Sequence, residues 1–139
     1  MSEASYSIED LKSLGPTVAA SLKSAGIRST SKLLEAAKDP KGRKALATRT
    51  GLDEKCILRS ANMADRMRIK GVGEDYAVLL EAAGVDTVRE LKYRNPRNLA
   101  KAMADANSKR KLGVQLLPSE TTIQRWIEHA KRLQLKISY

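Results

Sequence analysis

Ile69-Lys-Gly-Val-Gly-Glu-Asp-Tyr-Ala-Val-Leu-Leu-Glu-Ala-Ala-Gly-Val85 is the most informative part of the sequence, because an earlier part of the chain repeats it. Leu11-Lys-Ser-Leu-Gly-Pro-Thr-Val-Ala-Ala-Ser-Leu-Lys-Ser-Ala-Gly-Ile27 aligns with it at an offset of 58 residues and without a gap. The identical positions are Lys12/Lys70, Gly15/Gly73, Ala19/Ala77, Leu22/Leu80, Ala25/Ala83, Gly26/Gly84 and, further on, Leu33/Leu91. Agreement at so many glycine and apolar positions predicts an internal duplication.

The correspondence continues beyond these two stretches. Asp39-Pro40 matches Asn95-Pro96, and residues 53–59 match residues 119–125 after small insertions. The chain of 139 residues therefore divides into two units, which we place at 1–67 and 68–139. Since each unit alone would bury only a marginal core, we expect the two to pack into one compact body.

Local signals predict helices along nearly the whole chain. The longest are expected at about 53–68 and 119–135, where apolar residues recur at helical spacing. Strand signals are weak, because apolar and polar residues rarely alternate and phenylalanine is absent. The residues that mark helix starts and ends are Ser7, Asp39-Pro40, Asn95-Pro96, Gly26, Gly51 and Gly84. We predict an all-α fold of roughly ten short helices in two related bundles.

The second copy of the repeat resembles the helix-hairpin-helix motif of DNA repair, recombination and ligase proteins. In this pattern Gly71 and Gly73 form a tight turn with positive φ, Val72 plugs the turn onto the core, and Ala77 allows two helices to approach closely. The resemblance implies a helix-hairpin-helix-like (SAM-like) fold. It also implies that turn amides and the N-terminus of the second helix hold a backbone phosphate, a contact that reads no base.

The first copy has Ser13 in place of the first glycine, followed by Gly15-Pro16. The tandem layout with a late tryptophan helix is similar to a bacterial family of unknown function with two helix-hairpin-helix-like repeats. In the second copy, Glu74-Asp75 would place carboxylates where a phosphate would lie. We therefore expect the first copy to be the better candidate for phosphate contact, and the second to be structural.

The balance of charge favours an anionic partner. The chain has 26 Lys and Arg against 16 Asp and Glu, a net charge of +10, which is typical of proteins that bind nucleic acid or an acidic protein surface. Most of the excess falls in residues 36–70 and 106–139. The densest clusters are Lys41, Arg43, Lys44 and Arg49, then Arg59, Arg66, Arg68 and Lys70, then Lys109, Arg110 and Lys111.

Several other kinds of function are disfavoured. One cysteine and one histidine (Cys56 and His129) allow neither an intramolecular disulfide nor a four-ligand zinc site, and they leave little for nucleophilic catalysis. The polar start of the chain is unlike a signal peptide, and no apolar run approaches the length of a membrane helix. We expect a cytoplasmic protein with no cofactor, small-molecule substrate or enzymatic activity. Trp126 is expected in the core, and Tyr93 is the one candidate platform for base stacking.

Two functions remain open. The first is non-catalytic, sequence-independent binding of DNA through hairpin amides and basic helices, and the second is a protein-interaction or scaffold module in which the hairpins are purely structural. The residues assigned to nucleic-acid binding are Lys12, Gly15, Lys41, Arg43, Lys44, Arg49, Lys70, Gly71, Gly73, Lys109, Arg110 and Lys111.

Overall fold

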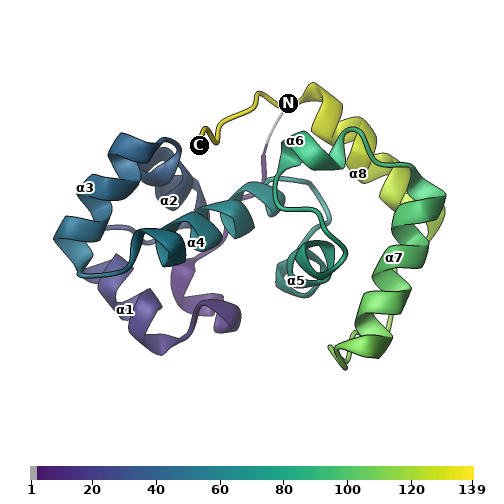
Figure 1. The fold of residues 1–139 in the computed structure, drawn as a ribbon, viewed down its shortest axis with the longest axis horizontal. Helices are drawn as coiled ribbons and strands as arrows, with labels where there is room; N and C mark the ends of the chain where they lie inside the picture. Colours follow the sequence, from purple (N-terminus) through teal and green to yellow (C-terminus); the bar gives the residue numbers. More distant parts are fainter. Residues whose placement is uncertain (1–2) are drawn as a thin grey trace.

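The computed structural model describes residues 3–139, which form eight α-helices and two single-turn 3₁₀ helices (Figure 1). Within these residues, extended pairing is limited to one isolated bridge between Ser7 and Ser29. The predicted all-α fold is confirmed. Residues 1–2 lie outside the described residues. They belong to the first predicted unit and to the polar N-terminal stretch that we predict not to be a signal peptide.

The two halves of the chain have the same order of α-helices. In the first half the elements are η1 (Ile8–Asp10), η2 (Lys12–Leu14), α1 (Pro16–Ser24), α2 (Thr30–Ala37), α3 (Pro40–Thr50) and α4 (Glu54–Arg66). In the second half they are α5 (Glu74–Ala82), α6 (Val88–Leu91), α7 (Pro96–Lys109) and α8 (Glu120–Arg132). The division into units at residue 67 stays a prediction.

The helix starts follow the predicted capping residues. The side chain of Asp39 accepts a hydrogen bond from the Gly42 amide at 2.7 Å at the start of α3, and Asn95 caps α7 in the same way through Asn98 at 3.0 Å. Each of these helices begins with a proline, whose lack of an N–H group loses no helical hydrogen bond at that position. Capping therefore fixes where α3 and α7 begin.

The ends of α1 and α5 have the same backbone geometry. Gly26 and Gly84 adopt φ of +84° and +94°, which favours glycine. The amide of the following residue, Ile27 or Val85, bonds back to the carbonyl of Leu22 or Leu80 at 2.9 Å in each case. Both following residues are buried, so each turn is anchored in the core.

The segment after Ser7 differs from the prediction. Ser7 was expected to cap a helix, but η1 is a single turn and the Ser7 side chain makes no capping hydrogen bond. This segment instead pairs with residues before α2: the Ile8 amide donates to the Arg28 carbonyl at 2.9 Å. Pairing with another part of the chain outweighs the local capping signal.

Helix α4 crosses between the two halves in Figure 1 and is the centre of the core. Its C-terminal part is buried on every side, so that residues 60–66 all lie in the interior. Trp126 of α8 is 2% exposed, which confirms the predicted core position. The core is continuous across the two halves.

Two buried arginines at the end of α4 hold the halves together, although the sequence suggested that both contribute to a surface cluster. Arg66 donates through Nε to the Ala77 carbonyl and through Nη1 to the Asp86 carbonyl, both at 2.9 Å. Arg68, two residues after the end of α4, pairs with Asp65 at 2.7 Å and donates through Nη2 to the Gln134 carbonyl beyond α8 at 2.6 Å. With exposures of 2% and 3%, neither arginine belongs to an exposed basic cluster.

The C-terminal segment 133–139 returns from α8 to the first half of the chain (Figure 1). Ile137 is buried, and the Ser138 amide donates to the Lys38 carbonyl at 2.8 Å. Arg43 donates to the Ser138 carbonyl at 2.7 Å and to the Ala37 carbonyl at 3.0 Å. We call this segment the C-terminal strap.

Candidate nucleic-acid interface

A groove whose charged side chains are all basic lies between the turn that precedes α5 and one face of α8. It has a volume of about 600 Å³. The residues lining it are Lys70, Gly71, Thr122, Arg125, Trp126, His129 and Arg132. No carboxylate is among them, so the groove, which we call the basic groove, presents positive potential to an anionic ligand.

The spacing along α8 places the polar side chains of the basic groove in one row. Thr122, Arg125, His129 and Arg132 recur at intervals of three or four residues, which puts them on one side of a helix. Arg125 and Arg132 are exposed, and Trp126 beside them is buried. The row is thus the polar margin of the face that α8 turns toward the core.

His129 links α8 to the turn. Its Nδ1 accepts a hydrogen bond from the Lys70 amide at 3.1 Å, which requires the imidazole to be unprotonated at that nitrogen. Burial lowers the pKa of His129 below 6.5, and the nearby Arg132 guanidinium lowers it further. A neutral His129 therefore fixes the position of Lys70 at neutral pH.

Gly71 is required by the geometry of the turn. Its φ is +93°, and a Cβ added there would lie 3.4 Å from Nε1 of Trp126. The ring of Trp126 also packs against Tyr76 of α5, with centroids 5.3 Å apart. Gly73 has an extended backbone with φ of −86°, so the positive φ expected at both glycines holds only at Gly71.

The amides of Gly71 and Gly73 have no hydrogen-bond partner within residues 3–139. Both glycines also line a neighbouring groove of about 750 Å³, together with Lys12 from η2. The structure therefore brings Lys12, Lys70, Gly71 and Gly73 together around one turn. Glu74 and Asp75 line the neighbouring groove but not the basic groove.

The first turn differs from the second because an internal carboxylate occupies it. The Ser13 amide donates to Oε2 of Glu74 at 2.5 Å. Gly15 is the N-cap of α1 with φ of +84°, and its own amide bonds to the Lys12 carbonyl at 3.1 Å. The Ser13 and Gly15 amides are therefore engaged within the protein, which counts against the first copy as the better candidate for phosphate contact.

The basic cluster of α3 is divided between surface and interior. Lys41 and Lys44 are exposed. Arg43 is 6% exposed, and its guanidinium donates hydrogen bonds to two main-chain carbonyls. Its assignment to phosphate binding is therefore wrong. Arg49 is exposed, but its Nη2 donates to the Ala25 carbonyl at 2.6 Å. Buried carbonyls at helix ends attract such guanidinium groups because few other donors reach them.

The third cluster, Lys109, Arg110 and Lys111, is exposed at the C-terminal end of α7. Figure 1 places α3 and α7 at opposite ends of the long axis, so these two clusters do not form one continuous patch. Tyr93 is 78% exposed, and the Lys92 ammonium lies over its ring, 5.1 Å from the ring centroid. Tyr93 lies outside the basic groove.

The sequence prediction missed Arg125, His129 and Arg132. Their spacing is present in the sequence, but the three residues are separated along the chain and form no dense basic run. The signal that finds them is the row of basic residues at helical spacing beside an apolar face. The row lies close to the turn at Gly71 through a tertiary contact, and residue spacing alone does not predict that contact.

Residues 3–139 contain no group of three or more His, Cys, Asp or Glu side chains arranged to hold a metal ion. In the same part of the chain, no helix has both the length and the apolar character needed to cross a bilayer.

Comparison with known proteins assigns the chain to a sequence family. No curated protein and no solved structure matches it. A family model described as "Domain of unknown function (DUF4332)" matches residues 12–133, which include both turns and all eight α-helices. The chain therefore belongs to the DUF4332 family.

Proposed function

We propose that the protein binds nucleic acid, and DNA in particular, through the phosphate backbone, without sequence preference and without catalysis. The observation that carries the proposal is the basic groove, in which Lys70, Arg125 and Arg132 surround the turn at Gly71 and no carboxylate lines the wall. Lysine and arginine contacts to phosphate supply most of the affinity in sequence-independent binding. The unpaired amides of Gly71 and Gly73 add donors of the kind that phosphate oxygens accept.

The dimensions of the groove fit one strand of a duplex. The row from Thr122 to Arg132 extends about 15 Å along α8 at the rise of an α-helix. At about 3.4 Å of rise per phosphate on one strand, this length faces about four phosphates. Three cations contacting them predict a slope of about −3 for the logarithm of affinity against the logarithm of salt concentration.

The helix-hairpin-helix interpretation of the two turns belongs to the same proposal. It is supported by the positive φ of Gly71, the buried Val72 and Ala77, and the matched ends of α1 and α5. The proposal assigns the phosphate to the second turn and an internal, architectural role to the first.

The test is titration of a labelled duplex of mixed sequence at several salt concentrations. We expect wild type to bind at low salt, and Arg125→Gln with Arg132→Gln to bind weakly with a slope reduced by about two. The matched control is Lys41→Gln with Lys44→Gln, which removes the same charge from α3. Absence of wild-type binding at low salt, or equal losses in both double variants, would overturn the proposal.

A second candidate is a protein-interaction module. It is favoured by the loop before α8, in which Leu116 and Leu117 are 78% and 39% exposed. Apolar residues exposed side by side are typical of surfaces that meet a partner. Pull-down with wild type and with Leu116→Ser plus Leu117→Ser distinguishes the two, because these changes leave the basic groove intact. Retention of a partner by wild type and its loss from the leucine variant, without DNA binding, would favour the second candidate.

A further inference from the structure

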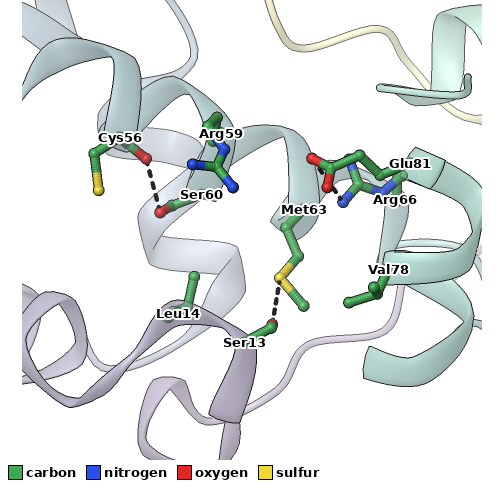
Figure 2. Close-up of a pocket in the computed structure, with 9 residues that line it drawn as sticks. All are labelled: Ser13, Leu14, Cys56, Arg59, Ser60, Met63, Arg66, Val78 and Glu81. Carbon is green, nitrogen blue, oxygen red and sulfur yellow. Dashed lines mark hydrogen bonds and ion pairs between the residues drawn. The ribbon is translucent and has the colours of Figure 1, made fainter. Parts of the chain in front are cut away.

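A third cavity, separate from the basic groove and from the neighbouring groove, lies where the two halves meet (Figure 2). Its volume is about 270 Å³, and it shares no lining residue with the basic groove. The lining comes from η2, α4 and α5: Ser13, Leu14, Cys56, Arg59, Ser60, Met63, Arg66, Val78 and Glu81. Small-molecule sites commonly combine an apolar wall with a few convergent polar groups in this way.

Arg66 gives this cavity a buried cation with hydrogen-bonding capacity to spare. Its Nε and Nη1 are satisfied by main-chain carbonyls at 2.9 Å. Its Nη2 makes no hydrogen bond within residues 3–139, and the Glu81 carboxylate, at 3.9 Å, is beyond hydrogen-bond distance. Burial also lowers the pKa of Arg66, in keeping with a charge that its surroundings compensate incompletely.

Arg59 supplies a second cation to the same cavity. It is seven residues before Arg66, so the two share one face of α4. Figure 2 shows its guanidinium on the cavity wall, and it has no ion-pair or hydrogen-bond partner among residues 3–139. With Glu81 of α5 also lining the cavity, the charged lining sums to one positive charge, which matches a monoanion.

The remaining lining residues fit an organic body. Leu14, Met63 and Val78 provide the apolar surface. The Ser13 hydroxyl donates to the Met63 sulfur at 3.2 Å, a weak acceptor that a stronger one would displace. A cavity of about 150 Å³ holds benzene in other proteins, so this cavity has room for a ring with a carboxylate.

From this lining we propose that the cavity binds a small organic monoanion, a carboxylate with an apolar body. Its carboxylate accepts hydrogen bonds from Arg59 and from Nη2 of Arg66, and its apolar part lies against Leu14, Met63 and Val78. Because η2 belongs to the first half and α5 to the second, such a ligand contacts both halves at once. The proposal is independent of DNA binding, since the two sites have no residue in common.

The experiment is a calorimetric titration of the whole protein with benzoate, with benzamide as the neutral probe of the same shape. We expect benzoate to bind saturably at millimolar concentration and benzamide to bind at least about tenfold more weakly, because charged hydrogen bonds are lost. Arg59→Gln should weaken benzoate about tenfold, whereas Glu81→Gln should strengthen it, because the competing carboxylate is gone. Arg59 is an exposed residue without structural partners among residues 3–139, so its replacement leaves folding intact.

The matched control is Lys55→Gln, which removes the same charge from α4 outside the cavity and should leave benzoate affinity unchanged. Absence of saturable benzoate binding, equal binding of benzamide, or an equal loss in Lys55→Gln would overturn the assignment.

Discussion

The main-chain amide of Ser13 and the side-chain carboxylate of Glu74 are joined by a hydrogen bond of 2.5 Å across 61 residues of sequence. Glu74 is the first residue of α5, and Ser13 lies in the turn before α1. The two turns are therefore coupled directly: one carboxylate satisfies an amide in the first turn. This contact engages the Ser13 amide, whereas the amide of Gly71, which aligns with Ser13 in the repeat, has no hydrogen-bond partner within residues 3–139.

Removing this contact should destabilise the protein. Glu74→Ala is expected to lower the free energy of unfolding by about 1 kcal/mol more than Asp75→Ala, since a partly exposed hydrogen bond to a charged group is worth about that much. Both variants remove one negative charge from the first turn of α5, so the difference isolates the Ser13 contact. Urea unfolding measures it, and equal losses in the two variants would contradict the coupling.

Acidification should weaken the fold through His129. Burial and Arg132 lower the pKa of this histidine below 6.5 in the folded state, so the unfolded chain takes up the proton at higher pH. The free energy of unfolding should therefore fall as pH drops below 6.5, and the loss should level off below the folded pKa. Urea unfolding between pH 7.5 and about pH 5, above the range of most carboxyl groups, measures the effect.

The control for this prediction is His129→Gln, which removes the titrating group and should flatten the pH dependence in that window. A wild-type stability that is constant or rises on acidification would show that His129 is not held neutral by its surroundings.

Arg43 and Lys44 are neighbours in sequence with different roles. Arg43→Met should lower the free energy of unfolding by about 2 kcal/mol, because two carbonyls, of Ala37 and Ser138, lose a charged donor. Lys44→Met, at an exposed position, should change it by no more than about 0.5 kcal/mol. Thermal unfolding of the pair measures the contrast, and similar melting temperatures would show that the C-terminal strap does not depend on Arg43.

The two glycines of the second turn should differ in their tolerance of alanine. Gly71→Ala places a side chain at φ of +93° and against Trp126, and should cost about 1–2 kcal/mol. Gly73→Ala, with an extended backbone and open space around the Cβ position, should cost less than about 0.5 kcal/mol. Chemical denaturation of both variants decides between this geometry and a turn in which both glycines are required.

The elements that the sequence predicts well are those governed by neighbours along the chain. Asp39, Asn95, Gly26 and Gly84 each set a helix end through contacts within a few residues, and each lies where its local signal indicates. The all-α fold follows from such signals. The buried state of Trp126 likewise follows from the spacing of apolar residues along one helix.

The features that the sequence does not predict depend on distant contacts. Nothing near Arg43 or Arg66 in the sequence distinguishes them from exposed arginines, since the carbonyls they meet belong to other segments of the chain. Arg68 has Asp65 three residues away, but its contact with the Gln134 carbonyl joins distant segments. The choice between the two turns depends on Glu74 reaching Ser13. The basic groove exists only because α8 packs beside the turn at Gly71.

The C-terminal strap has a consequence for biosynthesis. Because the Ser138 amide bonds to Lys38 and Ile137 is buried against the core, helices α2 and α3 lack some of their final neighbours until the strap itself has been translated. A ribosome adds about 5–20 residues per second, so the first half emerges seconds before its last partners do. During that interval the nascent chain exposes apolar surface that a chaperone or the tunnel exit would have to shield.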